Sequence, residues 1–304
     1  MRAMLKNFLQ VRKAAKEHAG FRMAVVAAED EASLRAAVAA RREDLAESVL
    51  LGDQIAVREG LERIGADPGQ FEIRPVAAAE EAAAEAVALA REGAVQVILK
   101  GHLPTSTLLR AVLARGTGLR TGRLLSDVRL FDHPFKTEGF LAVTDGGVIP
   151  APSLDQKRAI VENAVWVYHR LGWSVPKVAM LCATEKVLDA MPHTVEARRI
   201  RDWNREGLIS GCVVEGPISL DLALIRESAR AKGYDSPVAG EADILVGPTI
   251  EAVNILGKSL VYFKGCVPGQ VVVGSKVPVL IPSRSDGPEV KLNSIALAAA
   301  IGLA

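Results

Sequence analysis

Several common signatures of cofactor chemistry are missing from this sequence. No G-x-G-x-x-G follows the first predicted strand, which excludes the usual dinucleotide fingerprint, and the absence of G-x-x-x-x-G-K-[ST] excludes a P-loop. The three cysteines, Cys182, Cys212 and Cys266, form no C-x-x-C pair and lie in separate apolar runs. We therefore expect buried free thiols and no metal site.

Net charge and aromatic content are also low. The net charge is +1, from 37 basic and 36 acidic residues, so no global field attracts nucleic acid or an anionic membrane, and any anion site must be local. Aromatic residues make up 4% of the chain, which argues against stacking platforms for single-stranded nucleic acid. No apolar run is long enough to cross a bilayer, and the N-terminus lacks the apolar core of a signal peptide. We expect a cytoplasmic protein.

The sequence does contain a regular alternation of short apolar runs and amphipathic segments. Residues 22–28, 71–76 and 95–100 are predicted strands, with predicted helices between them. This pattern indicates βαβ units whose parallel strands are covered by helices on both faces. The alternation loosens between Gly116 and Pro152, which makes this stretch the candidate junction between the two domains expected for 304 residues.

The alternation resumes after the junction. The pattern predicts helices at residues 154–171, 220–232, 250–256 and 291–303, and strands at residues 177–182, 243–246, 260–263, 270–273 and 277–281.

Polar residues follow the last of these strands, at the carboxyl end where open α/β sheets bind ligands. Ser283 and Arg284 come directly after the apolar run, and Asp286 lies three residues beyond Ser283. A hydroxyl can donate to a developing oxyanion, and a guanidinium fits phosphate or carboxylate. An ordinary helix N-cap region is the alternative explanation for these residues.

A second polar group follows the predicted strand at residues 95–100. Lys100, His102, Thr105 and Ser106 gather beside the start of a predicted helix at residues 106–114. The free N–H groups at a helix N-terminus favour anions, so this group is a candidate anion site. A polar turn with Ser106 as N-cap is the alternative.

Five short motifs follow one another in the rest of the chain. D-G-G-V-I-P-A-P begins at Asp145, P-K-V-A-M-L-C-A-T at Pro176, G-P-I-S-L-D at Gly216 and A-D-I-L-V-G-P at Ala242, and the last is the Ser-Arg pair. Their order, with an Asn and a Lys before the Ser-Arg pair, resembles the phosphate acetyltransferase and phosphate butyryltransferase family. The resemblance extends from about Lys100 to the C-terminus.

The resemblance implies a fold and a reaction. The implied fold has two α/β lobes, each with a parallel sheet covered by helices, and an active-site cleft between them, as in isocitrate and isopropylmalate dehydrogenases. The last strands and helix would return to the first lobe, giving domains of residues 1–148 plus 270–304 and an inserted domain of residues 149–269. The implied reaction moves an acetyl or butyryl group between coenzyme A and phosphate by direct attack in a ternary complex. It needs no cofactor beyond coenzyme A as substrate, and no metal, nucleic acid or membrane; a homodimer or larger homo-oligomer is implied.

The resemblance also implies roles for individual residues. Ser283 would steady the oxyanion, Arg284 would bind phosphate, and Arg110, one turn into the predicted helix, would engage phosphate or coenzyme A. His102, Thr105, Ser106, Asn254 and Lys258 are candidates for further substrate contacts. Asn254 and Lys258 are four residues apart and therefore share a helix face. A partner for the helix dipole is the equal alternative for Lys258, and an ordinary surface arginine is the alternative for Arg110.

The general base is where this sequence departs from the acetyltransferases. They carry an Asp seven residues after the Ser, and here that position is Val290. Glu289 and Asp286 are equal alternatives for the base, and a base elsewhere is a third. Butyryltransferase-like members lack the same Asp, so the departure favours a longer acyl group.

Two other functions remain open at this point. A metal- or NAD-dependent dehydrogenase shares the two-lobed architecture, but it needs acidic metal ligands spaced D-x-x-x-D on a helix, and this spacing is not seen. A catalytically inactive family member would keep the fold without the acid.

Overall fold

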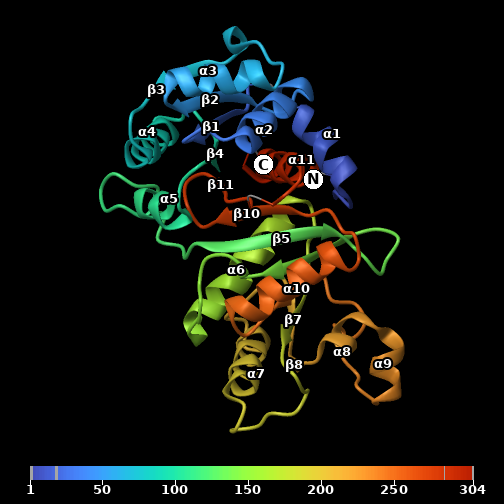
Figure 1. The fold of residues 1–304 in the computed structure, drawn as a ribbon. Helices are drawn as coiled ribbons and strands as arrows, with labels where there is room; N and C mark the ends of the chain where they lie inside the picture. Colours follow the sequence, from blue (N-terminus) through green and yellow to red (C-terminus); the bar gives the residue numbers. More distant parts are fainter. Residues whose placement is uncertain (1–2, 18–19, 284, 303–304) are drawn as a thin grey trace. The chain divides into compact units, whose positions relative to one another are not determined.

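The computed structural model describes residues 3–17, 20–283 and 285–302. The chain divides into two compact units (Figure 1). We call residues 8–123 and 269–304 the terminal unit, and residues 1–7 and 124–268 the central unit. Both units are α/β, with mostly parallel strands and helices packed on them, which confirms the predicted fold class.

The terminal unit has its strands in the order β3-β2-β1-β4-β11-β10. All neighbouring strands are parallel except β10, which runs antiparallel to β11. The strands are β1 (Arg22–Val26), β2 (Glu47–Gly52), β3 (Glu72–Pro75), β4 (Val97–Lys100), β10 (Gly269–Val273) and β11 (Val279–Leu280). The helices are α1 (Phe8–Lys16), α2 (Glu31–Arg42), α3 (Gln54–Arg63), α4 (Ala79–Arg91), α5 (Thr105–Val112) and α11 (Pro288–Gly302), with a 3₁₀ turn η1 (Pro68–Gln70).

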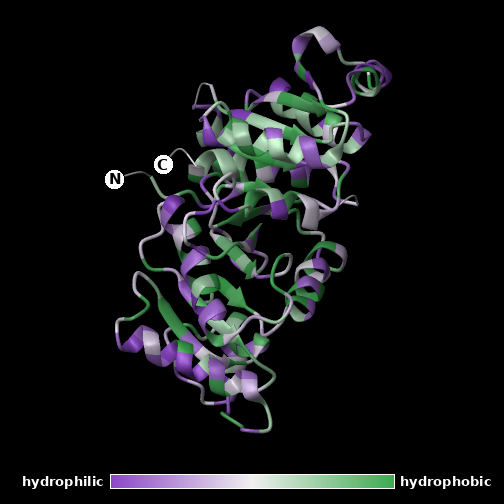
Figure 2. Ribbon diagram, turned by 90° about the vertical axis from the view of Figure 1, so that its left-hand side faces the viewer, coloured by the Kyte–Doolittle hydropathy of each residue, from purple (hydrophilic) through white to green (hydrophobic). Residues whose placement is uncertain are grey.

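Apolar composition explains why these elements pack. Helix α11 is buried along Val290–Ile301 because it contacts α1, α2 and β10, and its sequence from Ile295 to Ile301 is apolar on every side. Helices α2 and α3 are amphipathic and begin at Asp30 and Asp53, whose carboxylates accept hydrogen bonds from first-turn N–H groups. Figure 2 shows the same division, with hydrophobic strands and with hydrophilic residues gathered on the helices.

The central unit has its strands in the order β5-β6-β9-β7-β8, with β5 antiparallel to β6 and the other neighbours parallel. The strands are β5 (Ser126–Asp132), β6 (Phe140–Thr144), β7 (Lys177–Leu181), β8 (Val213–Ile218) and β9 (Ile244–Val246). The helices are α6 (Leu154–Arg170), α7 (Pro192–Arg205), α8 (Leu220–Leu224), α9 (Arg226–Ala231) and α10 (Ile250–Tyr262).

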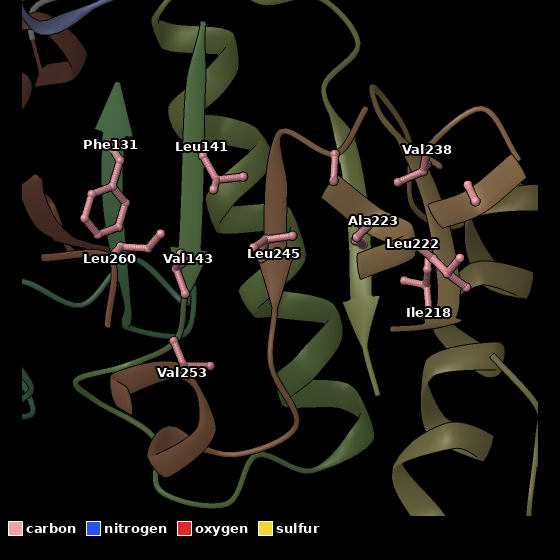
Figure 3. Packing of buried hydrophobic residues seen from close by; sticks show 13 residues of the cluster. Phe131, Leu141, Val143, Ile218, Leu222, Ala223, Val238, Leu245, Val253 and Leu260 are labelled. Carbon is pink, nitrogen blue, oxygen red and sulfur yellow. The ribbon is translucent and has the colours of Figure 1, made fainter. Parts of the chain in front are cut away.

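One hydrophobic cluster of the central unit joins its strands to α8 and α10 (Figure 3). Phe131, Val143 and Leu245 come from three neighbouring strands, and Val253 and Leu260 come from α10. All five side chains are buried, so α10 is fixed against the strands by apolar contact.

The division between the units falls earlier in the chain than residue 148. Strands β5 and β6 pair along their length, and β6 pairs with β9. Residues 124–148 therefore belong to the central unit, together with the rest of the chain up to residue 268. The N-terminal residues join them, because the N–H of Leu5 donates to the carbonyl of Leu171 and Trp173 Nε1 donates to the carbonyl of Leu5. Residues from 269 onward belong with the N-terminal half.

Two sequence predictions of local structure were wrong, and one helix was not predicted. The predicted strand at residues 260–263 is the last part of α10, and the helix ends only at a glycine cap. The N–H of Cys266 donates to the carbonyl of Leu260, the N–H of Gly265 donates to that of Val261, and Gly265 has a φ of +72°. A short apolar run in a sequence does not distinguish a strand from a helix. Here the hydrogen bonds of the glycine cap show that the run is the last turn of a helix.

The predicted helix at residues 220–232 is two helices, α8 and α9. The carbonyls of Leu222 and Ala223 accept hydrogen bonds from the N–H groups of Gly240 and Ala242 instead of continuing the helical ladder, and Ile225 is extended. Helix α1 was not predicted, although Phe8, Val11 and Ala15 have helical spacing and are buried.

No helix among the described residues combines the length and apolar character needed to cross a bilayer.

A buried histidine makes the stability of the central unit depend on pH. His133 is 7% exposed, its Nδ1 accepts from the N–H of Phe135, and burial lowers its pKa to about 4. Because the unfolded His binds a proton near pH 6.5 and the folded one only near pH 4, stability falls as the pH drops through this window. We expect His133 to cost up to about 2 kcal/mol of unfolding free energy at pH 5 relative to pH 7.5.

The variant His133→Asn keeps an acceptor for Phe135 and removes the titration. Urea unfolding of both proteins at pH 7.5 and pH 5 measures the effect, and the variant should lose less stability on acidification. Equal losses in the two proteins would show that the pKa of His133 is the same in the folded and the unfolded chain.

Candidate active site

The parallel pairing of β4 with β11 brings two polar loops to one edge of the terminal unit. Leu99 pairs with Leu280, so both strands end at the same edge, where neighbouring strands lie about 4.8 Å apart. We call residues 101–104, between β4 and α5, the β4 loop, and residues 281–287, between β11 and α11, the β11 loop. The predicted site residues His102, Thr105 and Ser106 therefore lie on one side of this pair, and Ser283 and Asp286 on the other.

The β4 loop is held tightly against the end of β1. The N–H groups of Gly101 and His102 donate to the carbonyls of Val26 and Ala27, at 2.9 and 2.8 Å. A Cβ at Gly101 would lie 2.4 Å from the Ala27 oxygen, so only glycine fits. Ala27 itself has a φ of +52°, a left-handed conformation that costs energy in a non-glycine residue and is common at functional sites.

Helix α5 begins with uncapped N–H groups. Its N-cap residue is Pro104, which offers no side-chain acceptor, and Ser106 is the second residue of the helix. The alternative that Ser106 is the N-cap was therefore wrong. The N–H groups of Thr107 and Leu108 donate to the carbonyl of Pro104. The N–H groups of Thr105 and Ser106, their hydroxyls and the exposed imidazole of His102 together form a set of donors suited to an anion.

Lys100 shapes the β4 loop from inside. Its Nζ donates to the carbonyls of Gly101 and Leu103, both at 3.2 Å, and its side chain is half-buried. These bonds curl the loop around the ammonium group, which also adds positive charge at the start of α5.

The β11 loop is a compact turn closed by Asp286. Its Oδ2 accepts from the N–H of Ser283 at 2.7 Å, and its own N–H donates to the carbonyl of Ser283 at 3.1 Å. Helix α11 begins only at Pro288, so Asp286 is not its N-cap. Ser283 is exposed, with its Oγ 3.0 Å from Ser285 Oγ, and is available to a ligand. Arg284 lies outside the described residues.

Glu289 has a different partner. Its Oε2 lies 2.6 Å from the Arg12 guanidinium, whose Nε also donates to Asn293 Oδ1. This ion pair joins α1 to the first turn of α11, and 64% of the Glu289 side chain remains exposed. The contact gives Glu289 a structural function that the sequence did not indicate.

Lys291 is a residue near the β11 loop for which the sequence predicted no role. This residue is buried in the first turn of α11, and its Nζ donates to the carbonyl of Asp286 at 2.7 Å. It places a cation beside the β11 loop. The available signal was the group Lys291, Asn293 and Ser294, three polar residues followed by the apolar run Ile295–Ile301.

The remaining predicted contacts are divided between the units. Arg110 is exposed on α5 in the terminal unit. Asn254 and Lys258 lie on α10 in the central unit; Asn254 Nδ2 donates to the carbonyl of Gly146 at 3.0 Å, and Lys258 is exposed. Asn254 thus holds the start of the D-G-G-V-I-P motif, a contact that the sequence did not indicate.

Asp145 organises that motif. Its buried carboxylate accepts hydrogen bonds from the N–H groups of Asp127, Gly147, Val148 and Ile149, at 3.0 to 3.3 Å. Burial raises the pKa of Asp145, and the four N–H bonds oppose that shift. The carboxylate acts as the centre of a loop and is shielded from solvent.

The cysteines offer no reactive thiolate. Burial raises the pKa of Cys182 and of Cys212 to about 11, so both thiols are protonated at neutral pH. Within the described ranges, no group of three His, Cys, Asp or Glu side chains is arranged to hold a metal ion.

Comparison with known proteins identifies the family. Residues 75–299 match the family described as phosphate acetyl/butaryl transferase. The chain belongs to this family. It is a phosphate acyltransferase, as the motif order indicated, and its relatives do not favour the dehydrogenase alternative.

Individual relatives of this phosphate acyltransferase differ in their acyl group. It is 39% identical to a phosphate butyryltransferase of Clostridium beijerinckii over 98% of both chains. It is 40% identical to a phosphate acetyltransferase of Rhizobium meliloti over 89% of this chain and 85% of the relative. The crystal structure of a branched-chain phosphotransacylase from Enterococcus faecalis has a TM-score of 0.81 and 30% identity, covering 93% of this chain and 99% of that one.

The close approach of the β4 loop to β1 can be tested by Gly101→Ala. The added Cβ would meet the Ala27 oxygen, so the loop must move away, and we expect a loss of about 1–3 kcal/mol in unfolding free energy and at least tenfold lower kcat/KM. Gly302→Ala is the control, because a Cβ there meets only ordinary contacts at 3.9 Å. Denaturant unfolding and steady-state kinetics measure both effects; full activity in Gly101→Ala would contradict a role for the loop.

Proposed function

We propose that this phosphate acyltransferase moves a short acyl group, butyryl in preference to acetyl, between coenzyme A and inorganic phosphate at the edge formed by the β4 and β11 loops. The observation that carries the preference is Val290, a buried apolar residue at the position where the resembled acetyltransferases carry an Asp. The butyryltransferase relative that matches over nearly the whole chain supports the same preference.

The chemistry required fits the donors at this edge. A phosphate oxygen attacks the thioester carbonyl carbon, the carbonyl oxygen becomes an oxyanion, and the carbon–sulfur bond then breaks to release the thiolate of coenzyme A. The start of α5, with Thr105, Ser106 and His102, offers N–H and hydroxyl donors for the phosphate. Ser283, exposed on the facing loop, offers a hydroxyl for the oxyanion.

Of the two candidate bases, Asp286 fits better than Glu289. Asp286 lies in the same turn as Ser283, whereas Glu289 is paired with Arg12 and helps to join α1 to α11. In the direction of acyl-CoA synthesis, Asp286 would take the proton of the coenzyme A thiol before the thiolate attacks the acyl phosphate.

The acyl preference can be tested by a thiol-release assay with acetyl-CoA, propionyl-CoA and butyryl-CoA plus phosphate. Each buried methylene contributes about 0.8 kcal/mol, so we expect kcat/KM for butyryl-CoA to exceed that for acetyl-CoA by about tenfold. Release without phosphate is the control for hydrolysis. A higher kcat/KM for acetyl-CoA would refute the preference, and no phosphate-dependent release with any of the three would refute acyl transfer.

The roles at the β11 loop can be separated by three substitutions. Ser283→Ala should lower kcat about 100-fold with little change in KM, because an oxyanion donor acts in the transition state. Asp286→Asn keeps an acceptor for the Ser283 N–H but removes the carboxylate, so it should lower kcat and abolish the acidic limb of the pH profile. Glu289→Gln should keep the pH profile and lose only stability.

Rates, pH profiles and denaturant midpoints of the three variants measure these effects. A wild-type pH profile in Asp286→Asn together with a lost acidic limb in Glu289→Gln would assign the base to Glu289 instead.

A further inference from the structure

Two lysines are buried among the described residues, and their partners differ. Lys157 on α6 is 2% exposed, and Lys291 on α11 is 5% exposed. The ammonium group of Lys157 forms an ion pair with Glu196 and lies 3.1 Å from His193 Nδ1. Lys291 has no such pair with any carboxylate in the described part of the chain. Since lysine is rarely buried without an acidic partner, Lys291 is the exceptional one.

The carboxylates closest to Lys291 in the sequence have other partners. Glu289 pairs with Arg12, and Asp286 Oδ2 accepts from the N–H of Ser283. The ammonium group of Lys291 donates instead to a neutral group, the carbonyl of Asp286, at 2.7 Å. This carbonyl is the one acceptor found for its three N–H donors within the described ranges. One bond to a neutral carbonyl does not offset the removal of a charge from water.

The position of Lys291 in its helix adds a second cost. Helix α11 begins at Pro288, so Lys291 is the fourth residue of the helix. The N-terminal end of a helix carries a partial positive charge, which repels a cation in the first turn. A methionine would fill about the same volume and avoid both costs. A residue that lowers stability in this way is expected at a functional site, where activity and stability conflict.

Lys291 connects the buried helix to the exposed β11 loop. Its bond to the carbonyl of Asp286 is followed by the 2.7 Å bond from the N–H of Ser283 to Asp286 Oδ2, and the N–H of Asp286 returns to the carbonyl of Ser283 at 3.1 Å. The helix is fixed by its burial, whereas Ser283 and Ser285 are exposed. Lys291 therefore anchors the turn that carries Ser283 to a rigid element of the terminal unit.

The β4 loop has a similar contact. Lys100 Nζ donates to the carbonyls of Gly101 and Leu103, both at 3.2 Å. Each of the two loops at this edge thus has an ammonium group bound to loop carbonyls. An ammonium group suits this task, because its donors point in several directions from one small centre.

We propose that Lys291 is a positioning residue for acyl transfer: its ammonium group fixes the carbonyl of Asp286 and, through the turn that Asp286 closes, the hydroxyl of Ser283. This inference rests on the proposed function, since it takes Ser283 as the oxyanion donor. A donor is effective only when it already lies where the oxyanion forms, and a displacement of about 1 Å can lower a rate about 100-fold. Lys291 acts on this geometry from its buried position, without contact to the substrate.

The main test is Lys291→Met, which keeps the length of the side chain and removes the ammonium group. With butyryl-CoA and phosphate, kcat should fall about 10- to 100-fold, because the misplaced hydroxyl is needed in the transition state. The KM for each substrate should stay within about twofold of the wild-type value. The urea midpoint should be equal to that of the wild type or higher, because the variant no longer buries a charge.

Hydrogen–deuterium exchange of peptides from residues 281–287 measures the loop directly. The amides of this loop should exchange at least about tenfold faster in Lys291→Met, while peptides from β1 and β2 keep their wild-type rates. Lys291→Gln keeps a donor without the charge, so its kcat and its exchange should lie between those of the wild type and Lys291→Met. If Lys291→Met does not fold, the rate and the exchange of Lys291→Gln decide the question.

The matched control is Lys157→Met, which removes the other buried ammonium group. It leaves Glu196 without its cation, so the urea midpoint should fall. Its kcat and the exchange of residues 281–287 should stay at the wild-type values. The two variants are thus expected to show opposite behaviour, one losing rate without stability and the other losing stability without rate.

The inference fails if Lys291→Met has the wild-type kcat, or if its urea midpoint falls while the exchange of residues 281–287 is unchanged. A higher KM with an unchanged kcat would place Lys291 in substrate binding and also overturn it. Failure of the proposed function is distinguishable, because the wild type would then release no thiol in the presence of phosphate. In that case faster exchange of the loop in Lys291→Met would still support its anchoring by Lys291, and equal exchange would overturn it.

Discussion

The parallel pairing of β4 with β11 is the contact on which the candidate active site depends. Only Ile98 with Val279 and Leu99 with Leu280 are in register, so the strand from the C-terminal segment is too short to hold its position by backbone hydrogen bonds alone. Helix α11 supplies the rest, because it is buried along its length between α1, α2 and β10. Arg12 adds a polar link between α1 and the start of α11. The apolar helix at the end of the chain therefore positions the β11 loop opposite the β4 loop.

The sequence predicted where the helices and strands lie better than it predicted which strands are neighbours in the sheet. Alternation of apolar runs and helices was enough for the fold class, and the strand ends at Lys100 and Ile281 marked the polar loops correctly. Which strands lie side by side depends on contacts between distant segments, which periodicity does not contain. The family resemblance supplied part of that missing information, because the order of its motifs implied that the C-terminal strands return to the N-terminal half. The errors at α8, α9 and α10 have the same origin: a glycine cap and two tertiary hydrogen bonds decided the backbone there.

The partners of the site carboxylates could not be inferred from spacing. Asp286 and Glu289 both lie within two helical turns of Ser283 in the sequence, which made them equal candidates for the base. In the structure, Asp286 closes the turn that contains Ser283, while Glu289 is neutralised by Arg12 from the other end of the chain. Asp145 shows the same limit in the central unit, where one buried carboxylate gathers four N–H groups of its own loop and of β5. A carboxylate has a few strong hydrogen-bond sites, and the folded backbone around it determines which groups occupy them.

A net charge near zero is compatible with recognition of two anionic substrates because electrostatic attraction is local. Exposed charges more than about 8 Å apart are largely screened at physiological ionic strength, so the arrangement of charges matters more than their sum. In the terminal unit, acidic residues pair with arginines on α1, β1 and β3, whereas the segments after β4 and between β10 and β11 have cations without acids. The same strands that bring the β4 and β11 loops together bring these segments together. A single topological feature, the insertion of β11 beside β4, thus brings together the donors that we propose for the reacting groups and the segments that carry cations without acids.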